Sequence, residues 1–297
     1  MLDFIGGAFL PGATPRRYFA GLMVALAVAG CFLGSTLTAA QTAGAGAMLP
    51  ADIRQSGVLK AGMPLDFAPY NFLDQKNQAV GLDVDMFNAI AAALTTKPAI
   101  ERLAFASIIP SVSGGRVNIG MSVMAITPAR LKQVSFVRYI RLANGLIVRS
   151  GNPTHINNND ACGHSIAVEQ GTQPVDVWEA VSKQCVQAGK PAIQLLTFNG
   201  EGPQVLAVQA GRADAAGVSF ATAMMAAETS NGKLEAAPGG PVKGFTVDAG
   251  IAFKPDHEDL GKAIEAALNT LVADGTYNKI LQKWHLQETA TTPAIVK

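Results

Sequence analysis

The sequence contains few charged residues. Asp, Glu, Lys and Arg together account for 15% of the 297 residues, and the 23 basic residues nearly balance the 22 acidic ones. Nucleic acids and anionic membranes attract proteins that carry a strongly basic field. The sequence has no such field, so we expect no nucleic-acid partner.

Recognisable metal-binding and hydrolase motifs are also missing. No Gly-x-Ser-x-Gly nucleophile elbow occurs, and no His stands at metal-ligand spacing. We therefore expect no metal site, no cofactor and no catalytic residue. The histidines are His155, His164, His257 and His285.

The N-terminal segment has the layout of a secretory signal. A basic pair at 16–17 is followed by an apolar run at 19–28 and by a stretch rich in Ala, Gly and Thr at 35–47. This order is typical of a signal peptide, so we expect residues 1–40 to be removed and the mature protein to be periplasmic. The remaining chain has 21 basic and 21 acidic residues and is formally neutral.

Three export routes use the same residues. The first is cleavage by signal peptidase after Ala40. The second is lipid anchoring through Cys31, because Val28-Ala-Gly-Cys31 resembles a lipobox, and the third is a twin-arginine signal that begins at Arg16. A permanent membrane anchor is a further alternative, since residues 19–37 approach the length of about 20 that a membrane span needs.

The length of 297 residues suits two domains of roughly 100 to 200 residues each. Apolar segments at 57–62, 99–105 and 117–124 are expected to be strands with helices between them, which indicates an α/β sheet. The sequence Gly115-Arg-Val-Asn-Ile-Gly recurs 96 positions later as Gly211-Arg-Ala-Asp-Ala-Ala. In each copy the glycine is expected to end a helix just before a short apolar strand. Two similar α/β lobes explain this repeat.

The expected lobe boundaries follow from turn-rich breaks in the chain. Lobe 1 is predicted at 51–148 and 249–288, and lobe 2 at 149–248, because Ser-Gly-Asn-Pro at 150–153 follows an apolar strand. The polar segment 289–297 is predicted to be a disordered tail. Two crossings between the lobes make a hinge, and a hinge between lobes makes a cleft that can close on a ligand.

The segment Gly81-Leu-Asp-Val-Asp-Met86, with the small-residue apolar helix that follows it, resembles the signature of the family-3 extracellular solute-binding proteins. Gly81 permits a turn, and Asp83 is placed to cap the helix. The resemblance implies two Rossmann-like α/β lobes joined by a two-crossing hinge, the type II periplasmic-binding-protein architecture. It also implies a monomeric receptor that delivers a small polar carboxylate-bearing solute, an amino acid or a derivative, to the permease of an ABC importer.

A helix start at Thr127-Pro-Ala-Arg130 contains a local conflict. Thr127 is a good N-cap, yet Arg130 places a cation in the first turn, where it opposes the helix dipole. A ligand carboxylate would compensate this charge, and pairing with a surface acid is the alternative. Met124 to Arg130 resembles the Leu-Thr-Ile-Thr-x-x-Arg loop of the family, whose arginine clamps the ligand α-carboxylate. The resemblance favours the clamp.

Two further segments resemble the ligand-binding loops of the family. Val168-Glu-Gln-Gly-Thr172 resembles its Gln-x-Gly-Thr loop, in which Thr172 is the expected cap and Glu169 stands where relatives touch the ligand. A solvated loop acid is the alternative for Glu169. Asp66-Phe-Ala-Pro-Tyr70 resembles the segment whose aromatic residue covers the ligand, here Phe67, while Tyr70 is expected in the core.

The sequence departs from the family where the ligand ammonium is usually held. Relatives place an aspartate at the position of Ser219, a Thr or Ser at the position of Ala125 and an aspartate near Pro64. Either Glu169 supplies the missing negative charge, or the ligand lacks a free α-ammonium. The full set of expected ligand-binding residues is Phe67, Ser122, Ala125, Arg130, Glu169, Thr172 and Ser219.

Two cysteines remain after the expected signal peptide, Cys162 and Cys185. An even pair in an exported protein favours a disulfide, and two buried free thiols are the alternative. Relatives with a Cys-Gly start to this strand carry the same pair and a Cys-x-x-Ala-Gly-Lys run like that at 185–190. The resemblance therefore implies a bridge.

Two classes of function remain in competition. The first is a binding protein without enzymatic activity. The second is an enzyme on the same scaffold, because some proteins similar to cyclohexadienyl dehydratase resemble these receptors. Glu169 is the candidate general acid for that second function.

Overall fold

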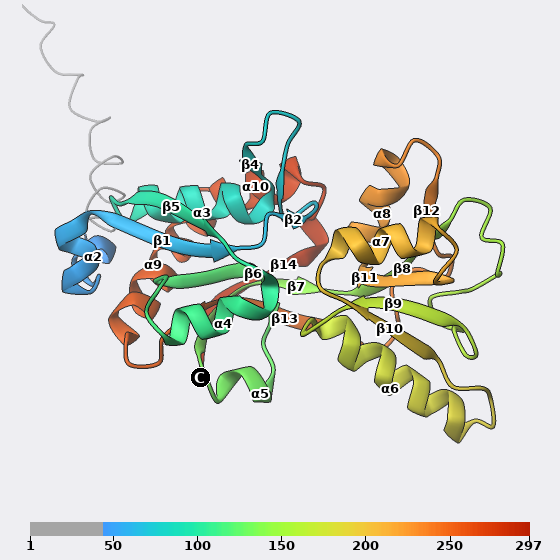
Figure 1. Cartoon of the computed structure of the whole chain (residues 1–297). Helices are drawn as coiled ribbons and strands as arrows, with labels where there is room; N and C mark the ends of the chain where they lie inside the picture. Colours follow the sequence, from blue (N-terminus) through green and yellow to red (C-terminus); the bar gives the residue numbers. More distant parts are fainter. Residues whose placement is uncertain (1–43) are drawn as a thin grey trace, which may run out of the picture.

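The computed structural model describes residues 44–297, which form two α/β lobes side by side (Figure 1). The expected signal peptide at 1–40, its cleavage site and the candidate anchor Cys31 lie outside the described residues. Within residues 44–297, no helix combines the length and the apolar character needed to cross a membrane.

Lobe 1 is built on a six-stranded sheet with the order β14-β7-β13-β6-β1-β5. Strands β5, β1 and β6 are parallel, whereas β13 runs antiparallel to both β6 and β7. All seven residues of β6 are buried, as expected for a central strand that is covered on both faces. The strands are β1 (Val58–Met63), β5 (Lys97–Arg102), β6 (Ile119–Ala125), β7 (Ser135–Leu142), β13 (Val247–Phe253) and β14 (Ala290–Val296).

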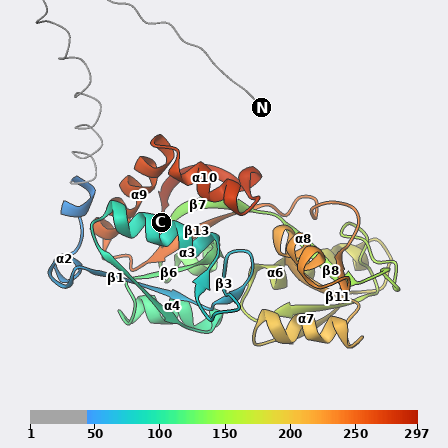
Figure 2. The same ribbon diagram turned by 90° about the horizontal axis from the view of Figure 1, so that it is seen from above.

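Helices cover both faces of this sheet. Helices α3 (Leu82–Ala93), α9 (Glu258–Ala273) and α10 (Thr276–Lys283) pack together on one face, and α4 (Phe105–Ser113) packs on the other. Figure 2 shows α9 and α10 separated from α4 by the strands. Each fully buried large aliphatic side chain of these two cores contributes roughly 1.5 to 3 kcal/mol to stability. Two short helices, α2 (Ala51–Ser56) and α5 (Pro128–Leu131), precede β1 and follow β6.

The signature segment lies at the start of α3, but its aspartate does not cap the helix. Gly81 has φ 127°, and a Cβ there would lie 2.2 Å from the Tyr70 carbonyl oxygen, so a glycine is required. Asp83 is fully buried and accepts hydrogen bonds from Asn71 and Tyr139 instead of backbone N–H groups of α3. The expected capping role of Asp83 is therefore wrong, because tertiary donors take both carboxylate oxygens.

A small antiparallel sheet connects β1 to α3. It consists of β2 (Asp66–Phe67), β3 (Asn71–Leu73) and β4 (Ala79–Val80). Its first strand lies at the edge of lobe 1 near α7 (Glu201–Gln209) of lobe 2, and it brings Phe67 to the region between the lobes.

Lobe 2 is built on a five-stranded sheet with the order β10-β9-β11-β8-β12. Helix α6 (Gln173–Gln187) packs on one face, and helices α7 (Glu201–Gln209) and α8 (Phe220–Thr229) pack on the other. The lobe thus repeats the layering of lobe 1. Its strands are β8 (Asn144–Arg149), β9 (Ser165–Glu169), β10 (Gln194–Phe198), β11 (Ala215–Ser219) and β12 (Leu234–Ala236).

The lobe boundary differs from the one expected at 148 and 149. Strand β8 pairs with β11 and β12, so it belongs to the sheet of lobe 2. The chain therefore enters lobe 2 next to Ala143 and returns to lobe 1 at Val247. The two crossings lie side by side, since the Asn144 amide donates to the Phe245 carbonyl at 3.0 Å. An apolar strand followed by a turn does not reveal which sheet it joins.

The segment 289–297 is not a disordered tail. After a 3₁₀ turn (Gln287–Thr289), β14 runs antiparallel to β7 at the edge of the sheet. Arg138 donates to the Thr292 carbonyl at 3.0 Å, and the Ile295 N–H donates to Glu265 at 3.1 Å. Proline is tolerated in an edge strand, so the polar composition and the proline misled the sequence prediction.

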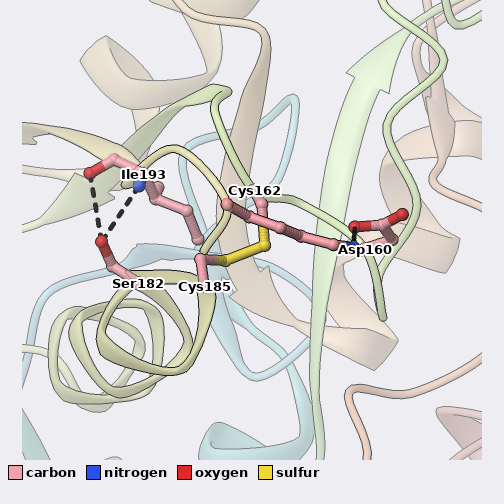
Figure 3. The surroundings of a disulfide bond; sticks show 6 residues. Asp160, Cys162, Ser182, Cys185 and Ile193 are labelled. Atoms are coloured by element: carbon pink, nitrogen blue, oxygen red, sulfur yellow. Dashed lines mark hydrogen bonds and ion pairs between the residues drawn. A yellow bond between two sulfur atoms is a disulfide. The ribbon is translucent and has the colours of Figure 1, made fainter. Parts of the chain in front are cut away.

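The expected disulfide is confirmed. Cys162, in the loop before β9, is bonded to Cys185 on α6, with a Cα–Cα distance of 5.6 Å (Figure 3). One turn earlier on α6, the Ser182 hydroxyl accepts a hydrogen bond from the Ile193 N–H at 3.0 Å. The bridge and this contact attach α6 to the segments that precede β9 and β10.

Candidate functional site

A cavity lined by residues of both lobes lies between them, and about 40 Å³ of it can be reached by the centre of a water-sized sphere. The ends of β6, β9 and β11 all reach it, as expected for parallel strands that point their carboxyl ends at a ligand crevice. All the residues expected to bind the ligand line this one cavity, namely Phe67, Ser122, Ala125, Arg130, Glu169, Thr172 and Ser219.

Arg130 connects the two lobes through its guanidinium. One nitrogen, Nη1, donates to the Ala125 carbonyl at 2.7 Å, and Nη2 donates to the Gly171 carbonyl of lobe 2 at 2.8 Å. The backbone N–H of Arg130 donates to Thr127 Oγ1 at 3.3 Å, so Thr127 is the expected N-cap of α5. Burial lowers the pKa of Arg130, while Asp176 opposes that shift. Among residues 44–297, no acid forms an ion pair with it.

Two aromatic side chains line the same cavity. Phe105, at the start of α4, lies under the guanidinium of Arg130 with its ring centroid 5.3 Å from Cζ. Phe67 is half-buried, and its ring centroid is 5.0 Å from that of Tyr70. Aromatic faces attract cations and pack well against aliphatic chains. The cavity can therefore accept both kinds of group.

Acidic side chains form a second charged part of the cavity. Glu169 ends β9, and its pKa is raised to about 7 by burial and by the nearby charge of Asp66. Glu201, in the first turn of α7, is only 9% exposed and lines the cavity. Burial, Glu169 and Asp66 hold the pKa of Glu201 well above its usual range. In the part of the chain that the structure describes, neither glutamate side chain has a hydrogen-bond or ion-pair partner.

Sequence reasoning missed Glu201. An acid in the first turn of a helix is favoured by the helix dipole, so its position carries no functional signal by itself. The folded structure makes Glu201 a candidate functional residue, because α7 starts at the edge of the cavity and the Glu201 carboxyl is buried there. Phe105, Asn144 and Gln204 also line the cavity without having been expected there.

Thr172 stands at the N-cap position of α6 but does not cap it with its side chain. Its hydroxyl instead donates to the Glu169 carbonyl at 2.7 Å. Gly171, with φ 77°, makes the turn that brings its own carbonyl to Arg130. The expected side-chain cap is thus wrong, since the hydroxyl stabilises the turn itself.

Ser219 has a role between the lobes. Its Oγ accepts the Thr222 N–H at 3.0 Å, which caps α8, and lies 3.1 Å from the hydroxyl of Tyr70 in lobe 1. Thr222 Oγ1 also donates across the gap to the Ala68 carbonyl at 2.9 Å. Tyr70 is buried, as expected, but its hydroxyl is part of this contact. The Ser219 hydroxyl is therefore already engaged.

Asp83 is connected to the wall of the cavity by a buried network of hydrogen bonds. The Asn71 side-chain amide donates to Asp83 at 2.8 Å and to Ser122 Oγ at 3.2 Å. The Tyr139 hydroxyl donates to Asp83 and accepts the Val123 N–H at 3.2 Å. Ser122 and Val123 line the cavity, so Asp83 orients this wall through Asn71 and Tyr139.

The histidines do not belong to the cavity. None of the four is among its lining residues. Within residues 44–297, no group of three His, Cys, Asp or Glu side chains is arranged to hold a metal ion.

Several known proteins are similar to this chain in sequence and in fold. The family of bacterial extracellular solute-binding proteins, family 3, matches residues 59–287. Arginine-binding protein ArgT of Corynebacterium glutamicum is 30% identical over 251 residues, which cover 84% of this chain and 81% of ArgT. The structure of an ancestral arginine-binding protein bound to arginine is 28% identical with a TM-score of 0.68, covering 77% of this chain and 98% of that one.

A second similar structure is that of an ancestral amino-acid-binding protein described as a precursor of cyclohexadienyl dehydratase. It is 27% identical with a TM-score of 0.66, and the match covers 78% of this chain and 97% of that one. Two α/β lobes around an inter-lobe cavity define the type II periplasmic-binding-protein class, which confirms the expected fold. The chain belongs to the family-3 bacterial extracellular solute-binding proteins.

Proposed function

We propose that this protein captures an amino acid in its inter-lobe cavity and delivers it to the membrane permease of an ABC transporter. The proposal rests on the unused hydrogen-bond donors of Arg130. Its guanidinium has five N–H donors, of which the described contacts use two, both on backbone carbonyls. A ligand carboxylate would be the negatively charged partner that Arg130 lacks within residues 44–297.

The surroundings of Arg130 support this role. The guanidinium is oriented by one carbonyl from each lobe, so it is fixed only when the lobes are closed. Phe105 shields one face of it from solvent. A fixed, partly desolvated fork is the arrangement that binds a carboxylate with two parallel hydrogen bonds. The relatives named as arginine-binding proteins support an amino acid as the solute.

A binding protein without enzymatic activity is the function that we favour. One observation favours the alternative, a dehydratase on this scaffold, because the pKa of Glu169 is raised to about 7 and makes it a competent general acid. Incubation with prephenate and with arogenate tests this alternative. Formation of phenylpyruvate or phenylalanine would assign an enzymatic activity, whereas unchanged substrate supports binding alone.

We further propose that the mature protein is periplasmic and monomeric, with lipid anchoring through Cys31 as one export route. Mass spectrometry of the protein isolated from bacterial membranes and periplasm gives the mature N-terminus. A diacylated Cys31 would show the anchored form, and a start at Gln41 would show ordinary cleavage.

The central proposal is tested with protein that has been unfolded in guanidinium chloride, dialysed and refolded, so that any copurified solute is lost. Calorimetric titration with each of the common amino acids should detect binding of at least one of them. The amine that lacks the α-carboxylate of that ligand should not bind. If the protein is shown to have refolded and none of the amino acids binds to it, the proposed function is wrong.

A further inference from the structure

We propose that Glu201 and Glu169, with Asp66 beside them, form a cation-binding subsite separate from Arg130, so that the preferred ligand is an amino acid with a basic side chain. The inference rests on the proposed function and specifies its ligand class. It assigns a role to Glu201, which no sequence motif marks.

Glu201 is buried at the cavity without a partner among the described residues. Its side chain is more than nine-tenths buried, lines the cavity, and has no hydrogen-bond or ion-pair partner among residues 44–297. A buried carboxyl without a partner is unfavourable, and more so when it is charged. Proteins keep such a group where a ligand completes it. A ligand cation is the partner that fits a carboxylate.

The three acids come from three separate elements. Asp66 lies on β2 of lobe 1, Glu169 ends β9, and Glu201 starts α7. Asp66 reaches over to lobe 2, since a Cβ added to Gly200 would lie 3.5 Å from its Oδ2. Closure of the lobes therefore brings the acids together. An enclosed cation would offset the repulsion between these acids.

The charged groups around the cluster offset this repulsion only in part. Glu169 and Asp66 both raise the pKa of Glu201, and Asp66 raises that of Glu169. Arg102 opposes the raised pKa of Asp66, and its Nε donates to the Pro64 carbonyl at 3.1 Å. Arg130 instead donates to the carbonyls of Ala125 and Gly171. The acids thus form a charged part of the cavity whose contacts are separate from those of Arg130.

A zwitterionic ligand with a second cation matches this pair of sites. Its α-carboxylate binds Arg130, and its side-chain cation binds the glutamates. Phe67 and Phe105 line the cavity as well and can pack along the aliphatic part of the side chain or on the cation. Arginine, lysine and ornithine have this distribution of charge, whereas neutral amino acids do not.

Proton release follows from the same arrangement. Burial and the neighbouring acids raise the pKa of Glu201 well above its usual range and that of Glu169 to about 7, so both carboxyls hold a proton more readily than exposed glutamates do. A bound cation favours the carboxylates and lowers those pKa values. Protons therefore leave on binding, and affinity for a basic ligand increases as the pH rises from about 5 to 8.

The test compares L-arginine with L-citrulline, which has a neutral urea group in place of the guanidinium. Calorimetry at pH 7 in two buffers of different ionisation enthalpy gives both the affinity and the number of protons released. We expect arginine to bind at least about tenfold more tightly than citrulline and to release about one proton. Citrulline should release none.

Glu201→Gln then tests the residue itself. This substitution should weaken arginine binding at least about tenfold, weaken citrulline binding by a smaller factor and reduce the proton release. Glu179→Gln, at an exposed position of α6 outside the cavity, is the matched control and should behave as the wild type. If Glu201→Gln does not fold, the arginine and citrulline comparison on the wild-type protein still decides the ligand class, and Glu169→Gln replaces it as the variant.

Each outcome has a separate meaning. Equal binding of arginine and citrulline, or arginine binding without proton release, overturns the cation subsite but leaves an amino-acid-binding protein. A preference for a neutral or acidic amino acid does the same. Absence of binding to every amino acid overturns the proposed function together with this inference.

Discussion

The hydroxyl of Tyr70 lies 3.1 Å from the hydroxyl of Ser219, and this contact joins lobe 1 to lobe 2 next to the cavity. Both side chains are buried. Beside them, Thr222 Oγ1 donates to the Ala68 carbonyl at 2.9 Å. These hydrogen bonds join one lobe directly to the other and do not involve a ligand. They therefore favour the closed arrangement whether or not a ligand is present. The closed state therefore has some stability of its own.

Tyr70→Phe should weaken this closed state. Loss of one buried hydrogen bond between the lobes is expected to lower ligand affinity about two- to tenfold, with a larger radius of gyration in the unliganded protein. Calorimetry and small-angle X-ray scattering measure the two effects. The substitution is cleaner than one at Ser219, whose hydroxyl also caps α8.

Tyr277→Phe is the matched control for Tyr70→Phe. The Tyr277 hydroxyl donates to the Tyr139 carbonyl at 2.7 Å, and both residues are in lobe 1. This variant should lose stability without a change in affinity or in the radius of gyration. Identical affinity and dimensions for the Tyr70 variant and the wild type would show that the contact does not influence closure.

Arg130→Ala should abolish most ligand binding while the protein remains folded. An unpaired carboxylate in the closed cavity would weaken binding by roughly 2 to 5 kcal/mol. The stability effect should be small, because Arg130 lies in the four-residue helix α5 and pairs with no acid within residues 44–297. Arg130→Lys keeps the charge but loses the planar fork, so intermediate affinity is expected.

Arg116→Ala provides the comparison for Arg130. Arg116 is exposed and pairs with Glu101 at the surface of lobe 1. Titration calorimetry and thermal unfolding of both variants separate binding from stability. Unchanged affinity in Arg130→Ala, with an unchanged melting temperature, would exclude Arg130 as the carboxylate clamp.

Reduction of the disulfide should destabilise lobe 2 without preventing ligand recognition. Cys162 and Cys185 are separated by 23 positions, and closure of a loop of this size stabilises a protein by about 3 kcal/mol in the chain-entropy account. Neither cysteine lines the cavity. The double replacement Cys162→Ser and Cys185→Ser should therefore unfold at lower urea concentration and bind the ligand with wild-type affinity under native conditions. A large loss of affinity in the still-folded variant would contradict this separation.

The buried Asp83 should make stability depend on pH. Burial raises its pKa to about 7, although Tyr139 and Asn71 donate hydrogen bonds to it. In the unfolded chain an aspartate titrates near pH 4. As the pH rises from about 4 to 7, the unfolded chain loses this proton while the folded protein keeps it, so the free energy of unfolding decreases.

Asp83→Asn removes this titration. Urea unfolding at pH 4.5, 6 and 7.5, values chosen to span the window between the two pKa values, should show that the wild type loses stability relative to the variant as the pH rises. Asp52→Asn, at an exposed position of α2, serves as the control. Parallel pH profiles for Asp83→Asn and the wild type would show that Asp83 titrates alike in both states.

The expected ligand-binding residues could be brought together from the sequence because each belongs to a turn with a local pattern. Thr127 and Pro128 mark the start of α5, and Gly171 marks the turn before α6. Such turns lie at the carboxyl ends of strands, and an α/β sheet gathers those ends at one edge. The residue motifs and the fold class together are therefore sufficient to predict which residues share the cavity.

Other features depend on contacts between distant segments and leave no local pattern. Glu201 resembles an ordinary first-turn acid until α7 is packed against the cavity. Strand β8 has the same apolar composition whichever sheet it joins, and only its pairing with β11 assigns it to lobe 2. The polar residues of β14 form a strand because β7 offers an open edge. The periodicity of the sequence does not indicate which of these distant segments pack or pair with one another.

The position of β13 determines the order in which the molecule can assemble. This strand lies between β7 and β6, so it joins two parts of the lobe 1 sheet that are otherwise unconnected by strand pairing. Every strand of lobe 2 precedes β13 in the chain. During synthesis from the N-terminus, lobe 2 can thus complete its sheet while lobe 1 is still divided. The segments from Val247 onward are synthesised last. They complete the sheet of lobe 1 and thereby the part of the cavity that lobe 1 forms.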